Sequence, residues 1–282
     1  MSPPRHDPVG GPIRLRIDLA YDGGPFAGFA RQRDQATVQG TIEGALSRLL
    51  GQEREVTCAG RTDRGVHALA QVVHLDVDGS ASHAARAIAN LEAMRRRLDR
   101  EVGPAITIWS VRRVSHDFHA RFSAVGRQYR YRLVDLPLAD PIQRHDRWLV
   151  GAELSVARMR RGAQWLIGEH DFATFCRKRR DRTTMRRIDE IAITRPSAGR
   201  IDLRFAGKAF CHQQVRAMVG CLVEVGQGLR DPAWIGELLE ARDRALAGRV
   251  SPPQGLTLER VSYGRRWPAA PPAAVRQHRR SA

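Results

Sequence analysis

The stretch Gly60–Val77, GRTDRGVHALAQVVHLDV, places a short charged loop directly before a strand. The loop has a glycine near each end, and its single carboxylate, Asp63, lies between two arginines. In the second part, Val73, Leu75 and Val77 alternate with other residues, as in a strand with one buried face. An acidic side chain between basic neighbours, in a loop that glycines keep tight, is a candidate for chemistry.

Beyond this stretch, the hydrophobic pattern predicts strands and helices along most of the chain. Alternation predicts strands at 13–21, 105–114, 127–133, 188–194, 201–205 and 256–263. Helical spacing predicts helices at 38–49, 82–98, 156–166, 213–225 and 232–246, with Thr37 and Ser155 as N-caps and Gly51 closing the first helix. Alternating strands favour an antiparallel sheet with one exposed face, which we expect to form a cradle for RNA.

These elements predict an α+β fold with two similar α/β halves that divide near Ser115. The expected regions are a disordered lead at 1–12, an N-terminal half at 13–114 with the Asp63 loop, a C-terminal half at 115–265, and a disordered tail at 266–282. The start, MSPPRHDPVGGP, lacks the apolar segment of a signal peptide. No run of about 18 apolar residues occurs, so no membrane span is expected.

The charge of the chain favours a polyanionic partner. The net charge is +17, and 45 of the 47 basic residues are arginines, since Lys178 and Lys208 are the only lysines. Arginines on phosphates release counterions, so an excess of this size favours nucleic acid. The run Arg177–Arg187, RKRRDRTTMRR, is either a solvated charged face or a strong electrostatic patch.

The cysteines indicate a reducing compartment. The four residues Cys58, Cys176, Cys211 and Cys221 are scattered and contain no C-x-x-C pair. Disulfide scaffolds and zinc ribbons need clustered cysteines, so we expect reduced thiols in a cytosolic protein. His116 and His119 are three residues apart, but no further ligand clusters with them, and no metal site is expected.

Asp63 has two interpretations. Aspartate in a turn often only forms the turn, because its side chain bonds to backbone two residues further on. Alternatively, Asp63 is a nucleophile or base paired with an arginine, since such pairing lowers the pKa of a carboxyl group and keeps it ionised. A third hypothesis, a hydrolase that uses Asp63 with His67, lacks a matching metal or triad pattern.

Two further segments have a structural and a functional interpretation each. In Arg127–Leu133, RQYRYRL, period two places Tyr129 and Tyr131 on one face, either as a core pair or with one tyrosine stacking on a nucleobase at the edge of a cleft. In Ala209–Gly220, AFCHQQVRAMVG, Arg216 flanks the apolar stripe of a helix. It is either a solvent-facing arginine or a cation that must be paired or kept at the rim.

Taken together, these segments resemble the TruA family of tRNA pseudouridine synthases. The resemblance covers roughly Ile13–Tyr263 and runs through six ordered blocks. These are YDGGPFAGFARQ with TVQGTIEGAL, GRTDRGVHALAQVVH, FHARFSAVGRQYRYR, HDFATFC with TMRRI, AFCHQQVRAMVG, and SPPQGLTLERVSY. The second block contains the highly specific pattern GRTDxGVHA.

The resemblance implies a fold and an activity. The expected fold has two α/β halves forming one extended, mostly antiparallel sheet, with helices on one face and a basic central cleft. The expected protein is a homodimeric isomerase that needs no metal or cofactor. Its substrate is the anticodon arm of tRNA, in which it converts uridines 38, 39 and 40 to pseudouridine. A tRNA-binding protein or RNA chaperone without catalytic activity is the alternative.

The resemblance also assigns roles to individual residues. Asp63 is the catalytic aspartate, Tyr129 the active-site tyrosine, Arg216 the arginine that pairs with the aspartate, and Arg61 the arginine that helps to hold the target base out of the stack. Leu256 or Leu258 supplies the apolar wall of the site, and we take Leu256. Expected RNA contacts are Arg31, Gln32, Arg179, Arg180 and Arg182.

One departure lies in the first block, where the family usually has Trp-Gln and this chain has Phe29-Ala30. Arg31 and Gln32, which follow, are retained. The departure concerns local packing or RNA contacts rather than the reaction.

Overall fold

The computed structural model describes residues 12–138, 140–177 and 183–264. These contain β1 (Ile13–Tyr21), α1 (Val38–Leu50), β2 (Thr57–Cys58), β3 (His67–Val77), α2 (Ser82–Ala89), α3 (Leu91–Val102), β4 (Ile106–Arg113), β5 (Gly126–Val134), β6 (Trp148–Leu149), α4 (Val156–Gln164), β7 (Gly168–Asp171), β8 (Met185–Ser197), β9 (Arg200–Gly207), α5 (Gln214–Gly226), α6 (Trp234–Ala241) and β10 (Leu256–Ser262). The predicted α+β class with a mostly antiparallel sheet is confirmed, since β1–β3, β1–β4, β2–β3, β5–β9, β7–β8 and β8–β9 are antiparallel pairs, and β6 joins β5 in parallel.

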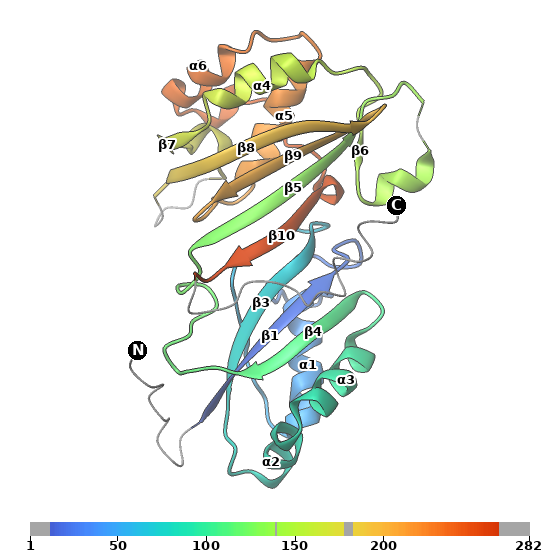
Figure 1. Cartoon of the computed structure of the whole chain (residues 1–282), viewed down its shortest axis with the longest axis vertical. Helices are drawn as coiled ribbons and strands as arrows, with labels where there is room; N and C mark the ends of the chain where they lie inside the picture. The colour runs from blue at the N-terminus through green and yellow to red at the C-terminus, as the bar shows by residue number, and fades with distance from the viewer. Residues whose placement is uncertain (1–11, 139, 178–182, 265–282) are drawn as a thin grey trace. The chain divides into compact units, whose positions relative to one another are not determined.

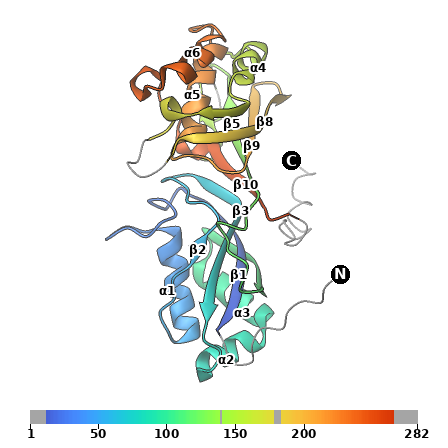
Figure 2. The same cartoon turned by 90° about the vertical axis from the view of Figure 1, so that its left-hand side faces the viewer.

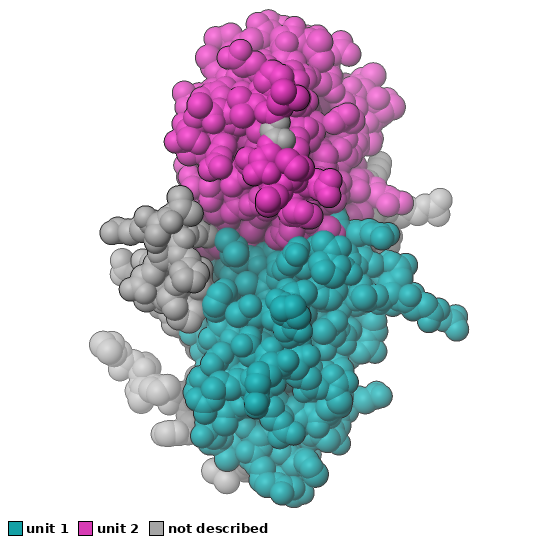
Figure 3. All heavy atoms as spheres, turned by 90° about the vertical axis from the view of Figure 1, so that its right-hand side faces the viewer, with its two compact units in different colours: residues 1–64, 68–125, 261–282 teal, residues 65–67, 126–260 magenta. Residues whose placement is uncertain are grey.

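The chain forms two compact units, coloured separately in Figure 3. Unit 1 contains the described residues up to Arg64, Ala68–Val125 and those from Val261 onward, and unit 2 contains Gly65–His67 and Gly126–Arg260. Both units are therefore discontinuous in sequence. The division near Ser115 stays a prediction. The predicted lead at 1–12, apart from Pro12, and the predicted tail at 266–282 lie outside the described residues.

In unit 1 the strand order is β4-β1-β3, with β2 added to β3. The register pairs Leu15 with Leu75 and Ile17 with Val73, so the two apolar stripes meet on one face. Helix α1 lies against one face of these strands (Figures 1 and 2). Thr37 accepts a hydrogen bond from the amide of Gly40, and Gly51 adopts φ 70°, so both predicted caps of α1 are confirmed.

The predicted helix over 82–98 is wrong in one respect, because two helices share this segment. Asn90 has an extended backbone, with φ −131° and ψ 92°, and separates α2 from α3. Its side chain accepts a hydrogen bond from the amide of Ala93 and caps α3. Helix α3 then continues to Val102, beyond the predicted end. Asn90 thus caps a second helix at a point where the apolar spacing alone predicts no break.

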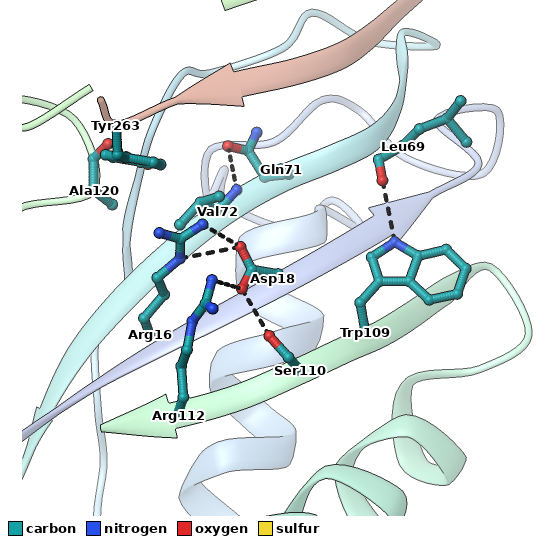
Figure 4. Close-up of polar contacts among 10 residues, drawn as sticks. All are labelled: Arg16, Asp18, Leu69, Gln71, Val72, Trp109, Ser110, Arg112, Ala120 and Tyr263. Carbon is teal, nitrogen blue, oxygen red and sulfur yellow. Dashed lines mark hydrogen bonds and ion pairs between the residues drawn. The ribbon is translucent and has the colours of Figure 1, made fainter. Parts of the chain in front are cut away.

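The second face of the unit 1 strands, which we expected to be exposed, is covered where β1 carries Arg16 and Asp18. Arg16 and Asp18 on β1 are only 1% and 6% exposed. Asp18 accepts hydrogen bonds from Arg16, Ser110 and Arg112 (Figure 4). The Arg16 guanidinium lies 5.2 Å from the ring centroid of Phe118 and 4.6 Å from that of Tyr263. Burial of these charges requires such pairing, so this part of the face cannot offer free cations to phosphate.

In unit 2 the strand order is β10-β5-β9-β8-β7, and β6 joins β5 in parallel. Tyr131 and Leu133 of β5 face the same apolar core as Leu203 and Phe205 of β9, together with apolar residues of α4, α5 and α6. Helix α5 lies on one face of β5, β8 and β9 (Figures 1 and 2). Ser155 caps α4 as predicted by accepting from the amide of Arg158.

The predicted helix over 232–246 is shorter than expected. Helix α6 ends at Ala241, because Arg242 adopts the left-handed conformation with φ 51°. A separate turn of 3₁₀-helix follows at Arg244–Leu246. The remaining predicted strands of this half occur within a few residues of their expected bounds.

Candidate active site

The loop that carries Asp63 is fixed to unit 1 on its N-terminal side. The amide of Ala59, just after β2, donates to the carbonyl of Val72 at 2.8 Å. The carbonyl of Thr62 accepts from the amide of Phe29 at 3.1 Å, and the Thr62 hydroxyl bonds to the Tyr21 hydroxyl at 2.8 Å. Thr62 is thereby held through both its backbone and its side chain, while the next residue, Asp63, is half-buried.

Two glycines allow the backbone to approach closely at this loop. Gly28 has φ 120°, and a Cβ atom there would lie 3.2 Å from the Thr62 carbonyl oxygen and 3.3 Å from the Arg64 nitrogen. Gly65 has φ 75°, which favours glycine in the turn that follows Asp63. The sequence argument for a tight loop therefore has a structural basis at Gly65, and Gly28 adds a second one from a distant segment.

Two predicted RNA-contact residues of unit 1, Arg31 and Gln32, follow shortly after Phe29, whose amide bonds to Thr62 of this loop. Arg31 is exposed and pairs with Glu43 at 2.6 Å, and Gln32 donates to the carbonyl of Ala27 at 2.9 Å. Arg61 is exposed beside Thr62. Arg179, Arg180 and Arg182 lie outside the described residues.

Tyr129 and Tyr131 lie on one face of β5, but their surroundings differ. Tyr131 is fully buried and donates to the carbonyl of Pro252 at 2.7 Å, and burial raises the pKa of its hydroxyl. Tyr129 is only half-buried, and its ring meets the edge of Phe210 at a centroid distance of 5.3 Å. Of the two, Tyr131 has the surroundings of a core residue, whereas Tyr129 lies at the border of the core.

Arg216 lies half-buried on α5, where the segment 249–251 crosses the helix. Its Nε donates to the carbonyl of Ser251 at 2.9 Å, and the amide of Ser251 returns a bond to the Arg216 carbonyl at 3.1 Å. One turn later, a Cβ atom on Gly220 would lie 1.9 Å from the Arg249 carbonyl oxygen. The crossing therefore depends on glycine at 220 and helps to orient Arg216.

Leu256 and Leu258 follow this crossing on β10. Leu256 is 6% exposed and belongs to the same apolar core against which Tyr129 packs, whereas Leu258 is fully buried. The preceding Gly255 is in contact with the ring of Tyr131, and a Cβ atom there would lie 2.6 Å from that ring. Tyr129 and Leu256 thus belong to the same apolar core within unit 2. Asp63 and Arg31 belong to unit 1.

Other reactive groups near the loop are limited. Burial raises the pKa of the Cys58 thiol to about 11, so this thiol stays protonated at neutral pH. In the described part of the chain the four cysteines are free. Among the same residues, no three His, Cys, Asp or Glu side chains gather as a metal site needs, and no helix is long and apolar enough to cross a membrane.

Comparison with known proteins identifies the family. A family model described as tRNA pseudouridine synthase matches residues 19–123 and 163–264. This chain belongs to the tRNA pseudouridine synthase family. It is 42% identical over 255 residues to tRNA pseudouridine synthase A of Frankia casuarinae, with 90% of each chain covered. The enzyme of the same name from Methylococcus capsulatus is 39% identical, with 89% of this chain and 90% of the other covered.

Among solved structures, a chain in a crystal structure of a Cbf5-Nop10-Gar1 complex matches with a TM-score of 0.40 and 12% identity. The match covers 88% of this chain and 48% of the other, so this chain spans about half the length of that one. A TM-score this low carries no argument about function.

The sequence analysis did not single out several buried polar residues around the Asp63 loop and α1. Tyr21 ends β1 and Gln71 lies within β3, and both are buried and hydrogen-bonded toward the Asp63 loop. Glu43 is 1% exposed on α1 and accepts from Gln39 at 2.8 Å and from the Val56 amide at 2.9 Å, besides its pair with Arg31. The sequence signal that could have identified these residues is a polar side chain at a position where the periodic pattern predicts burial.

The structure also limits the effect of the Phe29-Ala30 departure. Phe29 is 1% exposed, and its ring lies 6.3 Å from that of Tyr21. Its backbone amide donates to Thr62, and its carbonyl accepts from Gln39 at 2.9 Å. Backbone hydrogen bonds do not depend on the side chain, so phenylalanine preserves this link between α1 and the loop.

Proposed function

We propose that this chain converts uridine to pseudouridine in the anticodon arm of tRNA, at positions 38, 39 and 40, with Asp63 as the catalytic aspartate. Membership of the tRNA pseudouridine synthase family supports the reaction and the substrate class. The observation that supports Asp63 is the fixed position of its loop, in which both the carbonyl and the hydroxyl of the preceding residue are hydrogen-bonded to unit 1.

The reaction requires no change of oxidation state. The N1–C1′ bond of the uridine breaks, the uracil turns, and a C5–C1′ bond forms. The hydrogen on C5 leaves to solvent, and N1 gains a proton. The target nucleotide must leave the base stack, which enzymes acting on bases achieve by extruding it. Asp63 supplies the group that attacks the nucleoside or removes a proton from its sugar.

The remaining residues bind and orient the nucleotide. Tyr129 stacks on or lines the extracted base, with support from its half-buried position beside Phe210. Arg216 pairs with Asp63 and keeps the carboxyl group ionised. Leu256 forms the apolar wall, and Arg61 holds the base out of the stack.

Phosphate binding is assigned to Arg31, Gln32 and the basic run with Arg179, Arg180 and Arg182. The net charge of +17 supports a polyanionic substrate. We further propose a cytosolic homodimer. Sedimentation that gives a concentration-independent species near 31.6 kDa would contradict the dimer.

The test is to incubate the protein with tRNA transcripts labelled with tritium at uridine C5. Formation of the C5–C1′ bond releases the label to water, and digestion to nucleosides identifies the product. We expect tritium release with new pseudouridine at positions 38–40 only. Unchanged tRNA that is nevertheless bound supports the non-catalytic binder, whereas cleaved strands or free bases support a hydrolase. Replacing uridines 38–40 with cytidine in a matched transcript provides the control.

A further inference from the structure

A buried chain of polar side chains lies beneath the Asp63 loop. Gln71 is fully buried on β3, and its Nε2 donates to the carbonyl of Gly60 at 2.7 Å and to the Tyr21 hydroxyl at 3.3 Å. Tyr21 is 4% exposed, and its hydroxyl bonds to the Thr62 hydroxyl at 2.8 Å. Two residues just before Asp63 are therefore tied to one amide group on the neighbouring strand.

The direction of this chain is set by the backbone. The amide of Val72 donates to Gln71 Oε1 at 3.2 Å (Figure 4). This assigns Nε2 as the end that donates to Gly60 and Tyr21. The Tyr21 hydroxyl accepts from Gln71, and in its bond with the Thr62 hydroxyl either oxygen can be the donor. A side-chain bond also contacts this strand, since the indole Nε1 of Trp109 donates to the carbonyl of Leu69 at 3.1 Å.

The positions of these residues argue against a role in packing alone. Leu15, Ile17 and Leu19 precede Tyr21 on one face of β1, and the stripe of β3 reaches Gln71 through apolar residues. An apolar residue at either position would continue the stripe without burying a polar group. Burial of an amide and a phenol is unfavourable unless each is hydrogen-bonded. Polar residues at these positions therefore indicate that their hydrogen bonds serve to orient the loop.

We propose that Gln71 and Tyr21 are positioning residues, which act through Thr62 and Gly60 to fix the reacting geometry of Asp63. This inference rests on the proposed catalytic role of Asp63. Hydrogen bonds to a carbonyl and a hydroxyl set the path of the backbone into Asp63, and small displacements of a reacting group reduce rates strongly. Both side chains are buried, so we expect their loss to change rate rather than tRNA affinity.

The experiment compares single-turnover rates at saturating enzyme with tRNA dissociation constants. Tyr21→Phe removes one hydroxyl, Thr62→Val removes its partner while keeping the shape, and Thr62→Ser keeps the hydroxyl. We expect Tyr21→Phe and Thr62→Val to lower the rate by about 10- to 100-fold, with tRNA affinity within about twofold of the original protein. The double variant should be no slower than the slower single variant, and Thr62→Ser should stay within about threefold of the original rate.

Tyr263→Phe is the matched control. Tyr263 is a buried tyrosine of unit 1 that donates to the carbonyl of Ala120 at 2.7 Å, so it loses a comparable hydrogen bond away from the loop. It should keep the original rate. A rate within twofold of the original in both Tyr21→Phe and Thr62→Val overturns the inference, as does an equal loss in Tyr263→Phe. If Tyr21→Phe does not fold, the contrast between Thr62→Val and Thr62→Ser decides.

Asp63→Asn is measured alongside to separate the two proposals. If Asp63→Asn is inactive while Tyr21→Phe and Thr62→Val are fully active, the positioning role is contradicted and the catalytic role of Asp63 is retained. An active Asp63→Asn removes the catalytic role of Asp63 and with it the positioning role.

Discussion

The two units hold their candidate site residues by different means. In unit 1, Gly60 and Thr62 before Asp63 are held by hydrogen bonds with Phe29, Tyr21 and Gln71. In unit 2, Tyr129 and Leu256 rest on an apolar core, and a glycine allows the segment beside Arg216 to cross α5. Hydrogen bonds fix direction and depend on single atoms, whereas close packing depends on volume. Small polar changes should therefore affect unit 1 through rate, and added volume should affect unit 2 through stability.

The largest effect on stability is expected for Gly220→Ala in unit 2. The added methyl group would meet the Arg249 carbonyl oxygen at 1.9 Å, and backbone cannot move aside as a flexible side chain can. We expect a loss of about 3 kcal/mol or more in the free energy of unfolding, measured by urea denaturation. Gly44→Ala in α1 is the control, since its nearest contact would be Arg48 at 3.5 Å, and it should gain up to about 1 kcal/mol. Equal stability of the two variants would contradict the packing argument.

Arg216→Met should lower the rate by about 100-fold, which sharpens the comparison from the side of unit 2. The variant loses the bond from Nε to the Ser251 carbonyl and the positive charge proposed to pair with Asp63. Without that charge the pKa of the carboxyl group rises, so more of it is protonated as the pH falls. The rate relative to the original protein should thus be lowest at the acid end of a profile from pH 5 to 8. Parallel profiles for the two proteins would remove the pairing.

Gly28→Ala should reduce both stability and rate by moderate amounts. The residue has φ 120°, and its new Cβ would press on the Thr62 carbonyl oxygen at 3.2 Å. We expect a loss of about 1–3 kcal/mol from backbone strain and a rate about tenfold lower from displacement of the loop. Gly228→Ala in unit 2 is the matched control, because it has φ 81° and no atom within 4 Å of the added Cβ. It should lose stability but not rate, and a similar fall in rate would refute the effect on the loop.

His74 has no expected effect at neutral pH, and its effect appears only as the pH falls. Burial, with the positive charge of Arg14, lowers the pKa of this imidazole to about 4, and its Nδ1 accepts from the Ala120 amide at 3.2 Å. The folded protein thus binds this proton less readily than the unfolded chain. The contribution of His74 to stability is complete above about pH 6.5 and is lost as the pH falls toward 4. An NMR titration should show an imidazole that stays neutral down to about pH 5, and a midpoint above 6 would contradict this account.

Much of the fold could be predicted from the sequence because its signals are local. Alternation and helical spacing located most elements, and the caps at Thr37, Gly51 and Ser155 follow from adjacent residues. The break at Asn90 was missed because the apolar spacing continues through it. The burial of Arg16 was missed because Phe118 and Tyr263, which cover it, are distant in sequence.

Less of the candidate site could be predicted from the sequence, because its contacts join residues that are distant in the chain. Asp63, Tyr129 and Arg216 were found through a family resemblance, since each has an ordinary structural interpretation when taken singly. Tyr21 and Gln71 occupy positions that the apolar pattern assigns to the core, so only their hydrogen bonds to the loop reveal them. The contact of Arg216 with Ser251 joins residues that no local pattern connects.

The most direct test of the central claim is the yield of pseudouridine from Asp63→Asn in a single turnover at saturating enzyme. The amide has almost the size of the carboxylate, so folding and tRNA affinity should stay within several-fold of the original protein. The nucleophile or base is lost, and we predict no detectable pseudouridine after digestion to nucleosides. A rate of pseudouridine formation above about one per cent of that of the original protein would contradict the catalytic role of Asp63. Loss of such a group ordinarily lowers the rate far more than a hundredfold.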